Sequence, residues 1–376
     1  MPDLPPETQA DASLAGAPQA GATHADAPQA GATHADATLP GAPQNGAPQN
    51  GAPVTVTAEA YGKVNLLLGV GDARADGYHE LTTVFQSVDL RETVTVTRVE
   101  SKTGIQGLTA DSVFDDHVPT DSTNLAWRAV ELVREVAREH AAQGAQLRNS
   151  PDVGLRIDIR KGVPMAGGMA GGSADAAAAI VAAAEFFWPP EFVPIEELHA
   201  RAVTLGADVP FCLLGGTALG TGIGEELSPI LTRGTYHWVM VTNKKGLSTP
   251  TVFKKLDEQR QLAAEGQRPD VRVGDPGQVI KALRSGSAEL LAAQLGNDLQ
   301  APAVSLLPEL RETLGLAHQA GALRAIVSGS GPTVAVLCHD EDHAVEVLAN
   351  ITGAARGVRA VLATSPASGA RVVART

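Results

Sequence analysis

The chain has only two cysteines and no long apolar run among its 376 residues. Cys212 and Cys338 lie far apart without the paired spacing of a zinc site, so we expect reduced, buried thiols rather than a disulfide framework. No uninterrupted apolar stretch reaches the ~18 to 20 residues of a membrane helix, and we expect no membrane association. Because no basic segment followed by an apolar one opens the chain, we expect no secretory signal and a cytoplasmic protein.

Positive charge is also scarce. The sequence has 29 Lys and Arg against 42 Asp and Glu, which gives a formal net charge of −13. Proteins that bind nucleic acid in general need a cationic surface that displaces counterions from phosphate. The charge balance therefore argues against a nucleic-acid partner.

Residues 1–53 have no Lys, no Arg and no aromatic residue, but contain nine of the 24 prolines. The ten residues 17–26 are repeated at 27–36, and a five-residue unit is repeated at 41–45 and 46–50. Such a composition offers too little apolar area to offset chain entropy, so we predict a disordered tail. The remainder is long enough for two domains, which we place at residues 54–230 and 231–376.

The folded part mixes strand and helix patterns without a regular parallel alternation, which favours an α+β fold. Alternating or apolar stretches predict strands at 54–57, 64–70, 93–97, 153–159, 238–241, 325–327 and 334–337. One helix is expected to begin after Thr123, whose hydroxyl can cap it. An alanine-rich helix is expected from Ser173 to Phe187, closed by two prolines.

A glycine-rich loop at Pro164–Ser173 lies between a predicted strand and the alanine-rich helix. Successive backbone N–H groups and the positive end of the helix dipole can bind phosphate oxygens there, and Ser173 can cap the helix. The alternative is a tight turn whose glycines only relieve packing. Ser173 stands where a P-loop requires lysine, and Glu185 is too near for the acidic residue of a Rossmann site. Lys161 is the nearest cation to this loop.

Eight segments in order resemble the GHMP kinase superfamily over roughly residue 54 to the C-terminus. They are residues 60–66, 74–79, 123–125, 164–173, 205–211, 248–253, 296–299 and 328–331. The resemblance implies an N-terminal domain like the second domain of ribosomal protein S5 and a ferredoxin-like C-terminal domain. It also implies an ATP-dependent kinase that uses Mg²⁺ and acts on a small alcohol bearing a cytidine diphosphate group.

The resemblance also assigns roles to residues. Lys63 and Asp208 would be catalytic, although a strand lysine is more often solvated and a turn aspartate is often only a cap. Asn65, Tyr78, His79 and Phe253 would bind substrate, with the aromatic rings against the cytosine base. ATP would be bound by Lys161, Asn124, Pro164, Met165, Ala166, Gly167, Gly168, Met169, Ala170, Gly171, Gly172, Ser173 and Ala174, and Ser173 is a candidate magnesium ligand.

Two alternatives stay open on the sequence alone. One is another GHMP kinase that acts on a sugar, homoserine or mevalonate. The other is a nucleotide-binding regulator without turnover, which would have no need of the Lys63 and Asp208 pair.

Overall fold

The first of two sheets is built on two long antiparallel strands, β1 (Thr55–Ala73) and β2 (His79–Val99). The computed structural model describes residues 55–75, 77–100, 102–114, 117–165, 167–354 and 358–376, which belong to one compact unit. Within them the main strand order is β12-β1-β2-β4-β3, and β5, β6 and β8 pair beside this path. The other strands of this sheet are β3 (Gly104–Ser112), β4 (Gly154–Lys161), β5 (Thr217–Thr221), β6 (Glu226–Pro229), β8 (Gly296–Asn297) and β12 (Arg371–Arg375).

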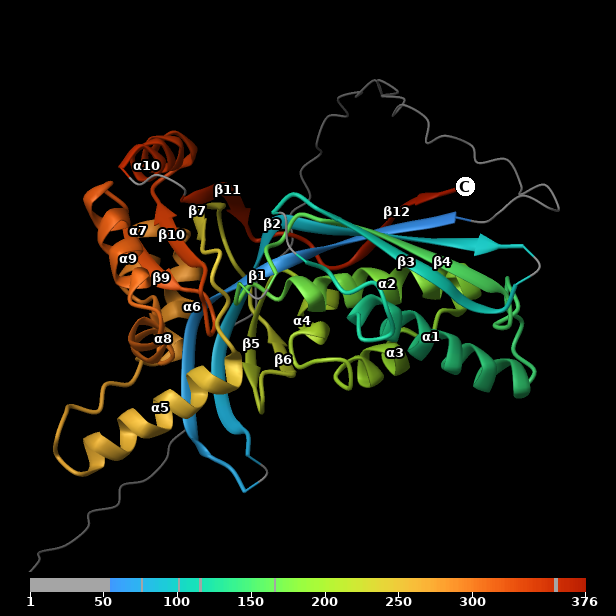
Figure 1. Ribbon diagram of the computed structural model, residues 1–376, viewed down its shortest axis with the longest axis horizontal. Helices are drawn as coiled ribbons and strands as arrows, with labels where there is room; N and C mark the ends of the chain where they lie inside the picture. Colours follow the sequence, from blue (N-terminus) through green and yellow to red (C-terminus); the bar gives the residue numbers. More distant parts are fainter. Residues whose placement is uncertain (1–54, 76, 101, 115–116, 166, 355–357) are drawn as a thin grey trace, which may run out of the picture. The chain divides into compact units, whose positions relative to one another are not determined.

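Helices cover one face of this sheet, as Figure 1 shows for α1 and α2 beneath β2, β3 and β4. The alanine-rich helix α2 is almost entirely buried, because its small side chains let it pack closely against the strands and α1. The helical segments of this region are α1 (Leu125–Ala142), α2 (Gly171–Phe187), a 3₁₀ turn (Pro190–Phe192), α3 (Ile195–Ala202) and α4 (Val209–Leu214).

The second sheet has the order β11-β7-β10-β9 and is antiparallel throughout. Its strands are β7 (Tyr236–Thr242), β9 (Arg324–Val327), β10 (Val334–Cys338) and β11 (Arg359–Ser365). Successive side chains alternate between two cores, one shared with α6 and α7 and the other with α5, α8, α9 and α10. These helices are α5 (Thr249–Ala264), α6 (Pro276–Ser285), α7 (Ala288–Ala292), α8 (Gln300–Leu306), α9 (Glu309–Gln319) and α10 (Glu341–Ala354).

Strand β1 joins these cores, and this places the candidate site. Val56 and Ala58 belong to the core beneath the first sheet, Val64 and Leu66 to a core of the second, and Val70 to the third. The β1–β2 register shifts just before Lys63 and again just after Asn65. Irregular pairing bends a strand, so both side chains lie where β1 passes from one core to the next.

The predicted α+β class is confirmed, but two helix starts differ from prediction. Helix α1 is capped by Asn124, whose Oδ1 accepts from Ala126 N at 2.8 Å, and not by Thr123. Helix α2 begins at Gly171, two residues earlier than predicted, because Ala170 takes a left-handed conformation (φ 59°) and is the N-cap residue. Ser173 is thus inside the first turn and does not cap it.

The predicted strands are present, and residues 55–57 and 64–70 belong to the single strand β1. The N-terminal segment 1–53 lies outside the described residues, and the domain division at residue 230 stays a prediction. The last strand, β12, pairs with β1 and so returns the chain to the first sheet. Both cysteines are buried free thiols, as predicted.

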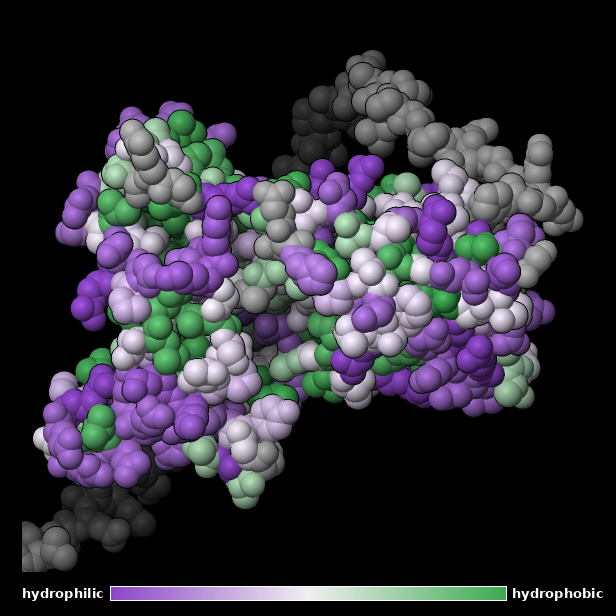
Figure 2. All heavy atoms as spheres, viewed as in Figure 1, coloured by the Kyte–Doolittle hydropathy of each residue, from purple (hydrophilic) through white to green (hydrophobic). Residues whose placement is uncertain are grey.

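Most charged side chains of the helices are exposed, but Arg134 on α1 and Asp175 and Glu185 on α2 are buried. On the face seen in Figure 2, hydrophilic residues gather over α5 and over α1. Among the described residues, no helix is both long and apolar enough to cross a bilayer.

Candidate active site

A cavity of about 690 Å³ is lined by segments from both halves of the chain. It has the size of pockets that bind small molecules. Its lining includes the predicted residues Lys63, Asn65, Tyr78, His79, Gly167, Gly168, Ala170, Gly171, Gly172, Ser173, Asp208 and Phe253. The structure therefore brings together side chains that are up to 190 positions apart in the sequence.

The N-terminus of α2 forms one wall of this cavity. Gly171, Gly172 and Ser173 make up the first turn, where the backbone N–H groups have no acceptors within the helix. The partial positive charge of a 17-residue helix is concentrated at the same place. This wall can therefore bind phosphate oxygens without a nearby lysine.

Gly168 allows the loop to approach a second loop closely. Its φ is +74°, and a Cβ atom there would lie 2.0 Å from the carbonyl oxygen of Ser328. Only glycine avoids both the strain and the clash. The glycine thus lets the glycine-rich loop pack against Ser328–Gly331, whose last three residues also line the cavity.

Several residues of the predicted ATP-binding stretch face away from the cavity. Met169 and Ala174 are fully buried in the cores, and Pro164 and Met165 are not among the lining residues. Ala166 lies outside the described residues. For Ala174 the cause is the first turn of α2, which exposes one side to the cavity and packs the other into the core.

Lys63 and Asp208 form an ion pair, with Nζ 3.6 Å from Oδ2. The lysine side chain is 5% exposed, while that of Asp208 is 33% exposed. Asp208 occupies the N-cap position of α4, but its side chain makes no capping hydrogen bond. The carboxylate therefore does not serve as a helix cap, which was the structural alternative for this residue.

The ammonium of Lys63 is held by several neighbours. It donates to Asn65 Oδ1 at 2.7 Å and to the carbonyl oxygen of Gly168 at 3.1 Å, and it lies 5.6 Å from the ring centroid of Phe85. These contacts fix the charge between the glycine-rich loop and Asp208. The arrangement places one cation and one carboxylate beside an anion site.

Asn65 is 2% exposed, and both ends of its amide are occupied. Its Oδ1 accepts from Lys63, and its Nδ2 donates to Thr83 Oγ1 at 2.8 Å. These bonds orient the lysine, and because Asn65 also lines the cavity, its predicted polar contact to substrate stays a prediction.

Tyr78, His79 and Phe253 line another part of the cavity. The rings of His79 and Phe253 have centroids 5.1 Å apart at an interplanar angle of 37°. The Tyr78 side chain is 59% exposed, while His79 is 7% exposed. Oδ1 of Asp257, one turn after Phe253 on α5, forms a hydrogen bond with His79 Nε2 at 2.8 Å. Sequence reasoning missed Asp257, although its helical i, i+4 spacing from Phe253 was a possible signal.

Lys161 does not reach the cavity, contrary to the expectation that it contacts phosphate. It is 1% exposed, and its ammonium donates to Glu92 Oε1 at 2.7 Å and to Asp175 Oδ2 at 2.6 Å. The lysine is buried because two buried carboxylates need a cation to compensate their charge. Glu92 Oε2 also accepts from Gly162 N at 3.0 Å, so this triad anchors the start of the glycine loop.

The triad has two acids for one cation. Burial and the charge of Asp175 raise the pKa of Glu92 to about 8, against the lowering effect of Lys161. Burial likewise raises the pKa of Asp175 to about 6, although Lys161 lowers it. Burial lowers the pKa of Lys161, but the two carboxylates outweigh it and the net shift is upward. The lysine therefore stays charged, and near neutral pH the two acids retain about one proton between them.

Asn124 also stays outside the cavity. Its side chain caps α1 and donates to the carbonyl oxygen of Pro119 at 2.7 Å, while the following residue, Leu125, is a lining residue. Asn124 thus has a structural role in capping α1, and its predicted contact with ATP stays a prediction.

Comparisons with known proteins agree on one family. The model of the GHMP kinases N terminal domain matches residues 124–216, and that of the GHMP kinases C terminal matches residues 279–356. The 4-diphosphocytidyl-2-C-methyl-D-erythritol kinase of Corynebacterium jeikeium (strain K411) is 50% identical over 348 residues, which cover 85% of this chain and 94% of that protein. The chain belongs to the 4-diphosphocytidyl-2-C-methyl-D-erythritol kinase family.

Other members of this family show the same likeness. The enzyme of that name from Mycobacterium tuberculosis (strain ATCC 25618 / H37Rv) is 48% identical over 321 residues, which cover 85% of this chain and 93% of that protein. A crystal structure of 4-(cytidine 5'-diphospho)-2C-methyl-D-erythritol kinase is 31% identical, with a TM-score of 0.63, and covers 83% of this chain and all of that one.

The fold is shared more widely than the family. A crystal structure of homoserine kinase from Cytophaga hutchinsonii has a TM-score of 0.62 at only 17% identity, and the match covers 85% of this chain and 97% of that one. Such a likeness shows the fold alone.

Proposed function

We propose that this protein transfers the γ-phosphoryl group of ATP to the 2-hydroxyl of 4-diphosphocytidyl-2-C-methyl-D-erythritol, a step toward isoprenoid precursors. Membership of the family supports the reaction. The observation that carries the proposal is the Lys63–Asp208 pair, 3.6 Å apart beside the first turn of α2. A binding module without turnover has no need of this pair.

The chain's own groups can perform each part of the transfer. Backbone N–H groups of residues 171–173 bind phosphate oxygens at the helix N-terminus. Asp208 accepts the proton of the substrate hydroxyl while the hydroxyl oxygen forms a bond to the γ-phosphorus. The bond between that phosphorus and the bridging oxygen breaks, and ADP leaves with the electron pair. Lys63 stabilises the negative charge that develops on the transferring group.

Magnesium fits the oxygen-rich set of groups at this place. Among the described residues, no cluster of three or more His, Cys, Asp or Glu side chains could hold a metal by itself. Mg²⁺ usually has few protein ligands and is held largely by substrate phosphates, whose charge it neutralises. The hydroxyl of Ser173 in the first turn of α2 would be its protein ligand.

The cytidine group would lie at the aromatic end of the cavity. Tyr78 offers an exposed ring face, and Phe253 packs beside His79 to form the opposite side. Stacking between aromatic side chains suits a base, and polar atoms at its edge can hydrogen-bond with the histidine. Two separate ends for base and phosphate explain how one cavity can bind both substrates.

The proposed partners are therefore small molecules, and we propose that the enzyme acts in the cytoplasm, where ATP is available. No nucleic-acid partner is proposed, since the formal net charge is −13.

A substrate panel tests the proposed function. The purified protein is mixed with ATP, magnesium and one alcohol at a time, and ADP release is measured. We expect turnover with the cytidylyl alcohol and little with its uridylyl analogue, homoserine, mevalonate or a free sugar. Turnover of a non-cytidylyl alcohol at equal kcat/KM would contradict the assignment, and so would an unchanged KM for the cytidylyl alcohol in Tyr78→Ala.

A further inference from the structure

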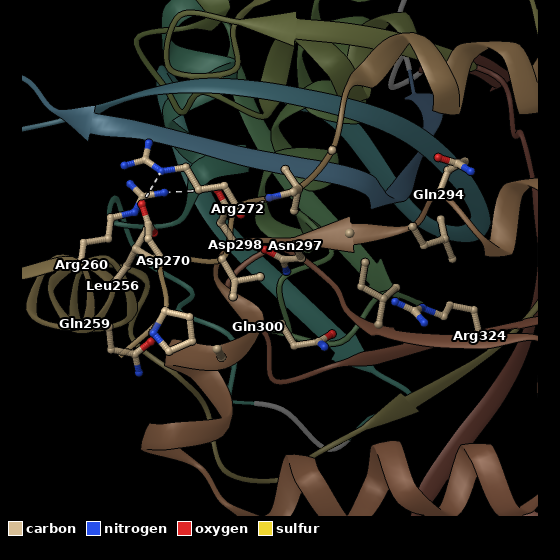
Figure 3. A pocket seen from close by; sticks show the side chains of 18 of the residues that line it. Leu256, Gln259, Arg260, Asp270, Arg272, Gln294, Asn297, Asp298, Gln300 and Arg324 are labelled. Carbon is tan, nitrogen blue, oxygen red and sulfur yellow. Dashed lines mark hydrogen bonds and ion pairs between the residues drawn. The ribbon is translucent and has the colours of Figure 1, made fainter. Parts of the chain in front are cut away.

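The segment Gly296–Leu299 contributes to the family resemblance, but nothing so far gives it a role. Its first two residues form β8, which pairs in parallel with Leu67 and Leu68 of β1. Figure 3 shows Asn297 and Asp298 side by side at the wall of a second cavity, whose lining contains no described residue of the glycine loop. This cavity has a volume of about 400 Å³. The two polar side chains thus lie between that cavity and β1.

Asp298 has a structural role. Its Oδ2 accepts from Val70 N at 2.9 Å and from Arg260 Nη2 at 3.2 Å, and its Oδ1 accepts from Val273 N at 2.7 Å. These bonds tie together β1, α5 and the segment that precedes α6. They do not lead to the catalytic pair.

Asn297 makes a different set of bonds. Its Nδ2 donates to the carbonyl oxygens of Val327 and Gly329, both at 2.7 Å, and its Oδ1 accepts from Leu299 N at 2.8 Å. The two carbonyl groups flank Ser328, where β9 ends and the loop of residues 328–331 begins. Both amide protons of Asn297 therefore fix the path of this loop.

The loop in turn contacts the catalytic lysine. Gly329 has a φ of +55°, and a Cβ atom there would lie 3.2 Å from Lys63 Nζ and 3.0 Å from the carbonyl oxygen of Gly168. The Gly168 carbonyl accepts hydrogen bonds from Ser328 Oγ at 3.0 Å and from Lys63 Nζ at 3.1 Å. A displacement of the loop would therefore move the lysine and the glycine-rich loop together.

We propose that Asn297 is a positioning residue for phosphoryl transfer, which sets the place of Lys63 through the backbone of Gly329. The inference rests on the proposed kinase function. Of the proposed base-binding residues, Tyr78 lies in the β1–β2 connection, His79 begins β2 and Phe253 is on α5. The hydrogen bonds of Asn297 go to none of them. Loss of its amide therefore lowers kcat and leaves the KM for the cytidylyl alcohol nearly unchanged.

The test is Asn297→Asp in the full chain. This change keeps the shape of the side chain but turns an oxygen toward the two carbonyl groups, which repels the loop. We expect kcat to fall by about 10²-fold, the cost of a displacement near 1 Å, with the alcohol's KM within a factor of about two of wild type. The matched control is Asn149→Asp, which breaks a bond of the same kind, from Nδ2 to the carbonyl oxygen of Phe186 at 2.7 Å, away from the cavity.

The outcomes separate this inference from the proposed function. If wild type turns over the cytidylyl alcohol and Asn297→Asp has the same kcat, the positioning role is wrong while the function stands. If wild type has no turnover with any alcohol, the proposed kinase function is wrong, and the positioning role, which rests on it, is wrong as well. A purely structural role would lower the melting temperature of both Asn variants but leave the kcat of folded enzyme unchanged.

A second variant covers the case in which Asn297→Asp does not fold. Gly329→Ala leaves Asn297 intact but places a methyl group against Lys63 Nζ and the Gly168 carbonyl. We expect the same loss of kcat with the same KM for the alcohol. A wild-type kcat in folded Gly329→Ala would overturn the link between this loop and the lysine.

Discussion

Replacing Asp175 by Asn should make the stability of the protein less dependent on pH. Asn keeps an oxygen for Lys161, and its NH₂ group takes the place of Oδ1, which has no hydrogen-bond partner. The substitution therefore loses no hydrogen bond. It removes one of the two buried negative charges and, with it, the second cause of the raised pKa of Glu92.

The size and sign of the effect follow from Glu92. Its pKa is raised from 4.5 to about 8 in the folded protein, so the stabilisation by its proton is complete below pH 4.5 and is lost as pH rises through 8. Linkage then gives a loss of about 3 to 4 kcal/mol between about pH 5 and pH 8 in wild type. The pKa of Asp175 is also raised, to about 6, so a further loss of unfolding free energy occurs in the lower part of the same pH range. Both losses have the same sign.

The assay is urea unfolding of both proteins at several pH values across that range. We expect the unfolding free energy of wild type to fall steeply with pH and that of Asp175→Asn to fall much less. Asp152→Asn removes an exposed carboxylate paired with Arg138 and should run parallel to wild type. Parallel curves for Asp175→Asn and wild type would refute the picture of two buried acids that share a proton.

Two further substitutions test the loop and the base site. Ala170→Gly should raise the unfolding free energy by about 1 kcal/mol, since a left-handed conformation (φ 59°) is strained for any residue with a Cβ atom; a lower melting temperature would contradict this. Phe253→Ala should raise the KM for the cytidylyl alcohol about tenfold or more with little change in kcat, because a stacked base contributes roughly 1 to 3 kcal/mol. Steady-state kinetics at saturating ATP measures this, and an unchanged KM would remove Phe253 from the base site.

Patterns along the chain predict parts of β1, β2, β4, β7, β9 and β10 and the helices α1 and α2, but not β3, β5, β6, β8, β11 or β12. The alternation at 153–159 and the glycines before the alanine-rich helix depend only on neighbours in sequence. The placement of Lys63 beside Asp208 came from the family resemblance, since no local pattern joins residues so far apart. In the structure it results from the bend of β1 and from the start of α4.

Two residues of the predicted ATP site, Lys161 and Asn124, do not line the cavity, for related physical reasons. Lys161 was expected at the phosphate because it is the nearest cation along the chain, but two buried carboxylates on β2 and α2 hold it inside. Asn124 was assigned to ATP, although its position directly before Leu125 makes it a helix cap. The ion pairs of Lys161 and the helix cap of Asn124 form only in the folded chain. The distance of these residues from the glycine loop in the sequence therefore did not indicate either contact.

The most direct test of the central claim is phosphoryl transfer by Asp208→Asn. Asparagine keeps the shape of the side chain but cannot accept the hydroxyl proton as a carboxylate does. We expect kcat to fall by about 10² to 10⁴, while calorimetry with a non-hydrolysable ATP analogue gives a Kd close to that of wild type. Near-normal turnover in folded Asp208→Asn would contradict the claim that Lys63 and Asp208 activate the alcohol beside the N-terminus of α2.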